Sequence, residues 1–443
     1  MKKSEIILND LGQTEEKYLN TKAPRKKGFA AVIAVSAVLA VLMIALPVIS
    51  KASSPSILPP ETAATAAQDE RSSPAEKETK PTTDPQPDGN LTVISLQPKY
   101  CADTFSKEGK LDATFSVGSD DRMLYDGLRF FESNGKTYIA YGELLNMYEF
   151  DGEAFARTDV RSPAMAFFTS GTHDGYIYVG GDYTSSGMFR RHGLFRFDPA
   201  DGTVEAFVEC EERVLVLSTA VIGSKVYYST IEATEKGDGA RFCLKCADTE
   251  SKEIKLLYEC DKSIDSLGVY DGTLYFTVSD DLCYLTDDNT LNIIGTDGEI
   301  DNYTVDGDRI FVYRLEWFQN GDGPEIRKYC VFEYGKDGNF IRSVTETGKF
   351  FMGELRDQLT VYNGKIVAFD KDGLYLYDMA ANEYEKIASF DQLIGSYVYY
   401  ESFIGNALNV SKAVYDGKLY IMYGQNILEY SENGIRTLKL KVF

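Results

Sequence analysis

The chain has 443 residues, of which 13% are aromatic, and its formal net charge at pH 7 is −22. Residues 1–90 carry equal numbers of acidic and basic side chains, so the whole negative charge falls on residues 91–443. A surface of this charge repels phosphate backbones, which excludes nucleic acid as a partner. The charge suits a soluble exported domain, and attraction of a basic partner is the alternative.

Residues 28–49 contain no charged side chain. At about 1.5 Å per residue they can cross the roughly 30 Å core of a bilayer as one transmembrane helix. Four basic residues at positions 22–27 precede this stretch and only Lys51 follows it closely. The positive-inside rule therefore predicts a single-pass protein of the cell membrane with residues 1–27 in the cytoplasm and an extracytoplasmic C-terminal part. A cleaved signal peptide is the alternative, because Ser50-Lys51-Ala52 offers small residues to a peptidase.

The cytoplasmic head, residues 1–27, is too short to form a domain. Apolar side chains at Ile7, Leu8, Leu11 and Leu19 can line one side of a short helix. Residues 4–20 could bind a cytosolic protein through this stripe or lie on the inner leaflet of the membrane, and simple disorder is the third alternative. The segment resembles the heads of single-pass proteins of low-GC Gram-positive bacteria, some of which look like anti-sigma factors. The resemblance implies a role in signalling.

Residues 50–95 are rich in Pro, Thr, Ser and Ala, and no aromatic residue occurs between Phe29 and Tyr100. This composition cannot bury a core, so we expect a disordered linker. A coil of forty residues reaches on the order of 35 Å, which keeps the rest of the chain near the membrane.

Residues 96–443 contain a repeat in which a tight turn precedes an apolar, aromatic-rich run. Asn-Gly and Asp-Gly tolerate the positive φ of two-residue hairpins, and the runs after them suit strands. The repeat length of roughly 35 to 57 residues is near that of propeller blades. We therefore predict an all-β fold, a β-propeller of four-stranded blades, most simply seven, with six to eight open. The repeats begin at Gly135, Gly175, Ser224, Gly272, Gly307, Gly364 and Gly417.

A further strand-like stretch, Tyr100 to Leu111, resembles Lys245 to Leu256, and we expect it to form an extra hairpin that closes the ring or belongs to an eighth blade. One blade resembles the kelch family, because Tyr176-Ile177-Tyr178-Val179-Gly180-Gly181 carries a double glycine after a strand and Phe207 stands where that family usually has Trp. The resemblance implies a propeller ring and suggests a binding scaffold.

Loop lengths place the candidate ligand site. Connections between the first and second strands, and between the third and fourth, share one face and are short, whereas the long connections share the other face. Tyr, Trp and Arg are the side chains that most often anchor interfaces and stack on sugars or peptides. The candidate ligand-binding residues on these longer connections are Asp182, Tyr183, Arg190, Arg191, His192, Trp317, Phe318, Tyr397, Tyr399 and Tyr400.

Signatures of catalysis are absent: there is no nucleophile elbow, no zinc-protease motif and no phosphate-binding loop. Two His residues cannot build a histidine-rich metal site, so we predict neither a metal site nor a cofactor, and leave weak calcium binding by acidic loops open. Cys243 and Cys246 are three residues apart on one expected strand, so their side chains should point to opposite faces as structural cysteines.

Together these patterns predict a membrane-tethered propeller that binds a protein or cell-envelope glycan, with signalling through the head as an extension. A glycosidase or lyase acting on envelope polysaccharide is the alternative. Two carboxylates facing each other at the mouth of the channel would favour the enzyme. An aromatic, Arg-lined surface without such a pair would favour binding, and a structural role in an envelope complex is a third possibility.

Overall fold

The structure is a computed structural model that describes most of residues 91–441. The described ranges are 91–107, 128–141, 146–161, 171–184, 190–210, 214–233, 239–286, 289–296, 298–318, 325–352, 358–370, 372–389, 410–423 and 426–441. The predicted head and membrane segment lie outside them. Within these ranges no helix is long and apolar enough to cross a membrane.

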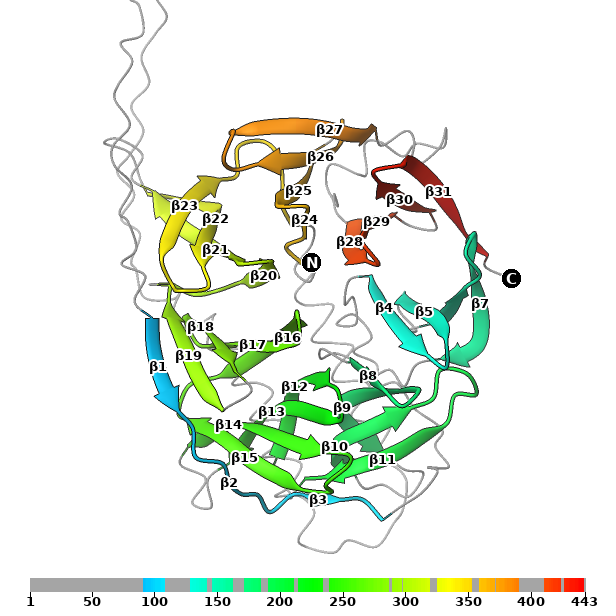
Figure 1. Cartoon of the computed structure of the whole chain (residues 1–443), viewed down its shortest axis with the longest axis vertical. Coiled ribbons are helices and arrows are strands. Elements are labelled where there is room, and N and C mark those ends of the chain that lie inside the picture. Colours follow the sequence, from blue (N-terminus) through cyan, green and yellow to red (C-terminus); the bar gives the residue numbers. More distant parts are fainter. Residues whose placement is uncertain are drawn as a thin grey trace, which may run out of the picture. The chain divides into compact units, whose positions relative to one another are not determined.

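Seven four-stranded antiparallel sheets form a ring, with the first strand of each sheet nearest the centre (Figure 1). The predicted propeller is thereby confirmed, with seven blades. Blades 1 to 4 are β4 (Arg129–Ser133), β5 (Lys136–Tyr141), β6 (Asn146–Phe150) and β7 (Ala154–Arg161); β8 (Gly171–His173), β9 (Tyr176–Thr184), β10 (Arg190–Phe197) and β11 (Val204–Glu209); β12 (Val214–Ile222), β13 (Lys225–Ala233), β14 (Ala240–Asp248) and β15 (Ile254–Cys260); and β16 (Ile264–Tyr270), β17 (Thr273–Val278), β18 (Asp281–Leu285) and β19 (Thr290–Gly295).

Blades 5 to 7 continue the same order around the ring. They are β20 (Asn302–Asp306), β21 (Arg309–Phe318), β22 (Ile326–Gly335) and β23 (Phe340–Thr345); β24 (Val361–Tyr362), β25 (Lys365–Asp370), β26 (Gly373–Asp378) and β27 (Glu383–Ser389); and β28 (Val410–Tyr415), β29 (Lys418–Tyr423), β30 (Asn426–Ser431) and β31 (Gly434–Lys441). Two-residue turns join the first and second strands of every blade, and Asn363 and Gly364 in one of them have φ of 51° and 76°, as predicted for such hairpins.

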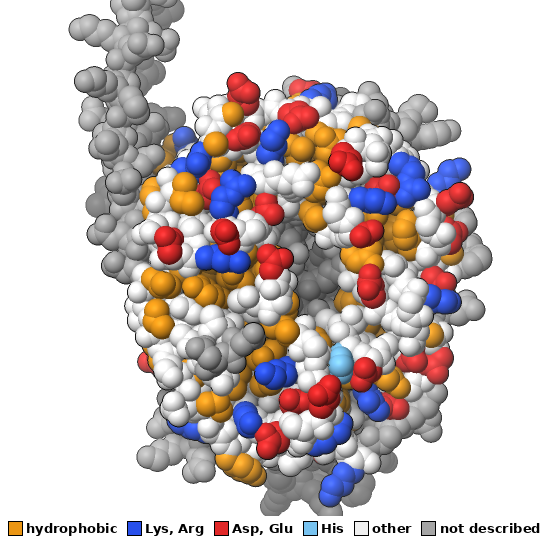
Figure 2. All heavy atoms as spheres, in the orientation of Figure 1, with side chains coloured by type: hydrophobic (Ala, Val, Ile, Leu, Met, Phe, Trp, Pro, Cys, Tyr) orange, Lys and Arg blue, Asp and Glu red, His pale blue; other side chains and the backbone are white. Residues whose placement is uncertain are grey.

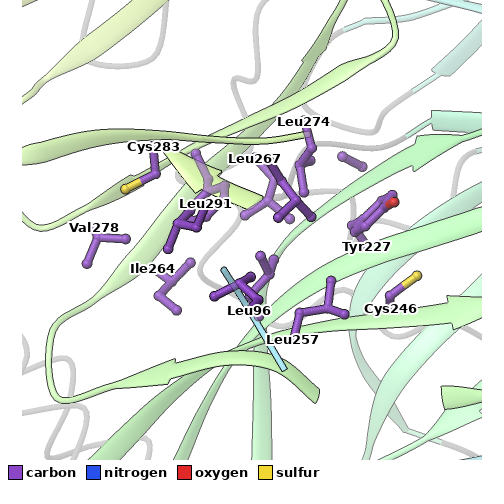
Figure 3. Close-up of a cluster of buried hydrophobic side chains, with 14 residues drawn as sticks. Leu96, Tyr227, Cys246, Leu257, Ile264, Leu267, Leu274, Val278, Cys283 and Leu291 are labelled. Atoms are coloured by element: carbon purple, nitrogen blue, oxygen red, sulfur yellow. The ribbon is translucent and has the colours of Figure 1, made fainter. Parts of the chain in front are cut away.

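The core lies between neighbouring blades, with one buried cluster at each of the seven junctions. β25 explains why the strands appear in the sequence as continuous apolar runs. Val367 and Phe369 pack toward blade 7, whereas Ile366 and Ala368 pack toward blade 5. Both faces of the strand are therefore buried. Figure 3 shows the cluster between blades 3 and 4.

The ring is closed by its first and last blades. β31 pairs with β7 in parallel, with Leu440 opposite Phe155. The cluster at this junction includes Phe155 and Leu438, which are fully buried. The rings of Phe130 and Tyr415 stack with centroids 4.4 Å apart. Closure thus combines backbone pairing with an aromatic core.

Residues 91–105 form a strap around the outside of the ring. β1 (Leu91–Ser95) pairs with β19, β2 (Lys99–Tyr100) with β15, and β3 (Thr104–Phe105) with β11, all antiparallel. The strap therefore adds a fifth strand to blades 4, 3 and 2. The first arm of the predicted hairpin, from Tyr100 to Thr104, is divided between β2 and β3, which pair with different blades. Its second arm, Lys110 and Leu111, lies outside the described residues. Leu96 of the strap is buried in the cluster of Figure 3.

A buried charge network fixes the strap. The Asp103 carboxylate accepts hydrogen bonds of 2.8 Å from both Lys245 Nζ and Tyr228 OH. Lys245 also pairs with Glu232 at 2.6 Å, and Arg241 pairs with Glu232 at 2.6 Å. Burial lowers the pKa of Lys245, but the nearby carboxylates of Asp103 and Glu232 have the larger effect, so the pKa of Lys245 is raised. Each buried charge therefore has a partner, as burial requires.

We expect Phe155→Ala to destabilise the ring by about 3–5 kcal/mol, because it empties a fully buried position at the closing junction. Urea unfolding followed by fluorescence measures the change. Phe350→Ala is the matched control: Phe350 is 45% exposed, so its loss should cost less than about 1 kcal/mol. Equal effects of the two substitutions would contradict the role given to this junction.

Candidate functional site

The strand ends that the longer connections join lie on one face of the ring, opposite the two-residue turns. The second strand of each blade ends at this face and the third begins there, and so do the fourth strand of one blade and the first of the next. The longest connections are 346–360, between blades 5 and 6, and 390–409, between blades 6 and 7. Figure 2 shows the opposite face, which carries the two-residue turns; it is hollowed at the centre of the ring, and its acidic and basic side chains are intermingled over the blades.

The hairpin β21–β22 of blade 5 carries an aromatic site toward the face of the longer connections. Its two strands are ten residues each, longer than the other strands of the blade, and their register pairs Trp317 with Arg327 and Leu315 with Tyr329. Directly paired residues and their neighbours two positions away share one face of a sheet. Tyr313, Tyr329, Arg327 and Trp317 therefore lie on one face of the hairpin. We call these four residues the aromatic stair.

Trp317 and Arg327 form the outer end of the stair. The Arg327 guanidinium lies 4.2 Å from the centre of the Trp317 ring, which is an attractive cation–π distance. Trp317 is nevertheless 58% exposed, so much of its surface remains open to solvent.

Arg327 also differs from most other arginines of this acidic protein. Arg196, Arg241, Arg309, Arg314, Arg342 and Arg436 each form an ion pair with a carboxylate. In the described part of the chain no carboxylate forms an ion pair with Arg327, although the charge of Asp301 acts on it from farther away. Its donors are thus available to a ligand that stacks on Trp317.

The inner end of the stair is a stacked pair of tyrosines. The rings of Tyr313 and Tyr329 are 4.9 Å apart and nearly parallel, at 9°. Tyr313 is buried in the cluster between blades 5 and 6, whereas Tyr329 is 37% exposed. One face of the Tyr329 ring is therefore covered by Tyr313. The buried ring supports the exposed one.

Glu346 lies beneath the stair. Its Oε1 accepts hydrogen bonds from Tyr313 OH at 2.9 Å and from the backbone N–H of Phe351 at 2.7 Å. Burial raises the pKa of this carboxyl group, although both hydrogen bonds and the charge of Lys412 act in the opposite direction. The carboxylate fixes Tyr313 and, through it, the stacked Tyr329.

Phe318 lies on the opposite face of the hairpin from Trp317, because the two are adjacent in one strand. It packs against the cluster between blades 4 and 5, and Lys328 Nζ lies 5.5 Å from its ring centre. The structure therefore does not bring these two aromatic candidates onto one surface.

The remaining candidates are placed only in part. The backbones of Asp182 and Tyr183 lie in β9, opposite His192 and Arg191 of β10, and Arg190 pairs with Thr184. These five residues thus share one hairpin of blade 2, but their side chains are outside the described set. Tyr397, Tyr399 and Tyr400 lie in 390–409, also outside it.

Tyr313, Arg327, Tyr329 and Glu346 are not among the residues predicted from the sequence. The signal available for the first three was the hairpin register: once Gly307 fixes the start of β21, residues paired across the hairpin can be counted. No pattern in the sequence pointed to Glu346.

The cysteines give no sign of a reactive site. All seven are free thiols. Burial raises the pKa of both Cys243 and Cys246 to about 12, which keeps the two thiols protonated at neutral pH. Within the described ranges no group of three or more His, Cys, Asp or Glu side chains is arranged to hold a metal ion.

Among known proteins, the chain shows only weak structural similarities. The chain matches no protein-family model, and no curated protein matches it. One similar structure is the extracellular domain of a one-component system from B. thetaiotaomicron, at 13% identity and a TM-score of 0.41, over 79% of this chain and 40% of that one. The chain thus spans less than half of that protein.

Two further structures are similar to a comparable degree. The β-propeller domain of the Trilobed protease from Pyrococcus furiosus has 12% identity and a TM-score of 0.38, over 62% of this chain and 82% of that one. The polysaccharide lyase Uly1 has 10% identity and a TM-score of 0.40, over 79% of this chain and all of that one. Similarities at this level carry no argument about function, and the propeller assignment rests on the strand pairing.

We expect Glu346→Gln to stabilise the protein at pH 7. Because burial raises the pKa of Glu346 above its usual value, folding favours the protonated form. The stability that this preference provides is fully present below the unfolded pKa and is lost as pH rises through the folded pKa. The two proteins should therefore have the same urea midpoint below about pH 4.5 and diverge above it.

Glu383→Gln, on the exposed outer strand of blade 6, is the control and should leave the pH profile unchanged. A lower urea midpoint for Glu346→Gln at pH 7 would show instead that the charge itself holds Tyr313.

Proposed function

We propose that the chain is a membrane-tethered extracytoplasmic propeller that binds a cell-envelope glycan through the aromatic stair. The single observation that carries the proposal is the arrangement of Trp317 and Tyr329. Both rings are exposed on one face of one hairpin, and each is supported from behind.

This arrangement suits a sugar polymer. Fixed aromatic rings lose little conformational freedom when they bind, so their contact area contributes to affinity at low entropic cost. A sugar ring offers an apolar face for stacking and hydroxyl groups at its edge. Arg327, which forms no ion pair with a carboxylate in the described part of the chain, can donate to those hydroxyl groups.

The glycosidase or lyase alternative requires a pair of carboxylates at a defined separation. Two described carboxyl groups lie near the stair. Glu346 accepts hydrogen bonds from Tyr313 and Phe351, and the charge of Asp301 acts on Tyr329 and Arg327. The exposed rings of Trp317 and Tyr329 are what favours binding over catalysis. A protein ligand remains the alternative occupant of the same surface.

Membrane attachment through residues 28–49, with the head inside and the propeller outside, is part of the proposal and rests on the sequence pattern. A site on the ring and a head at residues 4–20 would then lie on opposite sides of the membrane. This topology suits a protein that reports an envelope ligand to a cytosolic partner.

The only Trp of the chain is in the stair, so intrinsic fluorescence reports directly on the proposed site. We expect soluble glycan strands released from bacterial peptidoglycan to change Trp317 emission in a saturable titration of the full chain in detergent. Tyr329→Ala should weaken that binding at least tenfold, about 1.4 kcal/mol, because it removes a central aromatic contact.

Phe350→Ala, an exposed aromatic outside the stair, is the matched control and should bind like the unmodified chain. If glycan strands leave the emission unchanged while extracted envelope proteins alter it, the ligand is a protein. If neither changes it, the stair is not a binding site.

A further inference from the structure

The outer edges of the blades differ in what covers them. The strap pairs with β11, β15 and β19, and β7 and β31 pair with each other. Within the described ranges, β23 of blade 5 and β27 of blade 6 have no strand on their outer side. A bare outer strand presents a row of backbone N–H and C=O groups that can pair with another strand.

The two bare edges are not equally protected. β27 exposes Glu383, Glu385 and Lys386, and charges of this kind discourage pairing. β23 exposes Ile341 and Ser343, and its one charged residue, Arg342, pairs with Glu333 at 3.0 Å. β23 therefore has the character of an edge that a further strand covers.

The strap leads directly to this edge. It meets blade 2, then blade 3, then blade 4 as the chain is followed toward its N-terminus. Leu91, its first described residue, contacts the turn before β23: a Cβ at Gly338 would lie 3.1 Å from Leu91 Cβ. The chain upstream of Leu91 therefore starts beside blade 5.

The sequence upstream suits an edge strand. It reads Asp84-Pro85-Gln86-Pro87-Asp88-Gly89, with the two prolines at alternate positions. Successive residues of a strand direct their N–H groups to opposite sides, and proline is tolerated on an edge where its nitrogen faces solvent. With Pro85 and Pro87 facing outward, the N–H groups of Asp84, Gln86 and Asp88 all face the blade.

We propose that residues 84–89 add to β23 as an antiparallel fifth strand, so that the strap spans four blades. The six residues match the length of β23, Phe340–Thr345. The linker from the membrane then joins the ring at the blade that carries the aromatic stair. This inference is independent of the proposed ligand.

Hydrogen exchange of the full chain in detergent tests the proposal. β19 is the internal reference for a covered edge and β27 for a bare one. The amides of β23 that face away from the blade, which are every second one, should be protected from exchange as strongly as the corresponding amides of β19. Gln86→Pro removes an N–H that faces β23, and should speed exchange of these amides by roughly tenfold while leaving β19 unchanged.

Thr83→Pro is the matched control, because it adds a proline to the same segment on the side that faces solvent, and it should leave β23 unchanged. Both substitutions lie upstream of the described ring, so neither threatens its folding. Exchange of β23 as fast as that of β27 in the unmodified chain would overturn the proposal. Protection that survives Gln86→Pro would overturn it as well, because another occupant would then cover the edge.

Discussion

The pairing of β7 with β31 is the constraint on which the rest of the structure depends. The four blade strands of each sheet come from one continuous stretch of sequence, and among the described residues no N-terminal strand completes the last blade to lock the ring. Without this junction, the facing surfaces of blades 1 and 7 would expose the cluster around Phe155 and Tyr420 to water. Because each blade buries both faces against its neighbours, closure completes the last of seven equivalent interfaces.

The strap adds a second constraint at the outer rim. Two of its three strands are only two residues long, and backbone pairing of that length fixes register weakly. Asp103 lies between these two short strands in the chain, and its network partners Lys245 and Glu232 belong to blade 3. A buried ion pair contributes little net stability, but removing one partner is strongly unfavourable. A shifted strap would leave Lys245 without Asp103, so we infer that the network acts mainly by selecting one register.

The sequence repeat was sufficient to predict the architecture because two-residue turns have strict backbone demands. Asn363-Gly364 and Asp416-Gly417 could be recognised by composition, and the strands that follow could be counted from them. The strap could not be recognised in this way. Its two-residue strands have no periodicity of their own, and the likeness of Tyr100–Thr104 to part of blade 3 suggested a hairpin instead. Trp317 was found by its rarity, whereas its partners Arg327 and Tyr329 depend on a cross-strand register.

The route of the strap determines how tension would pass through the molecule. A pull on the linker would load the pairing proposed between residues 84–89 and β23 first, and then the five register pairs of β1 and β19. It then reaches Leu96, the short pairs of β2, and the Asp103 anchor, and only afterwards β3. The seven inner interfaces carry no load until these outer contacts have failed. The strap can therefore detach from the outer strands in steps under tension, while the ring of blades stays folded.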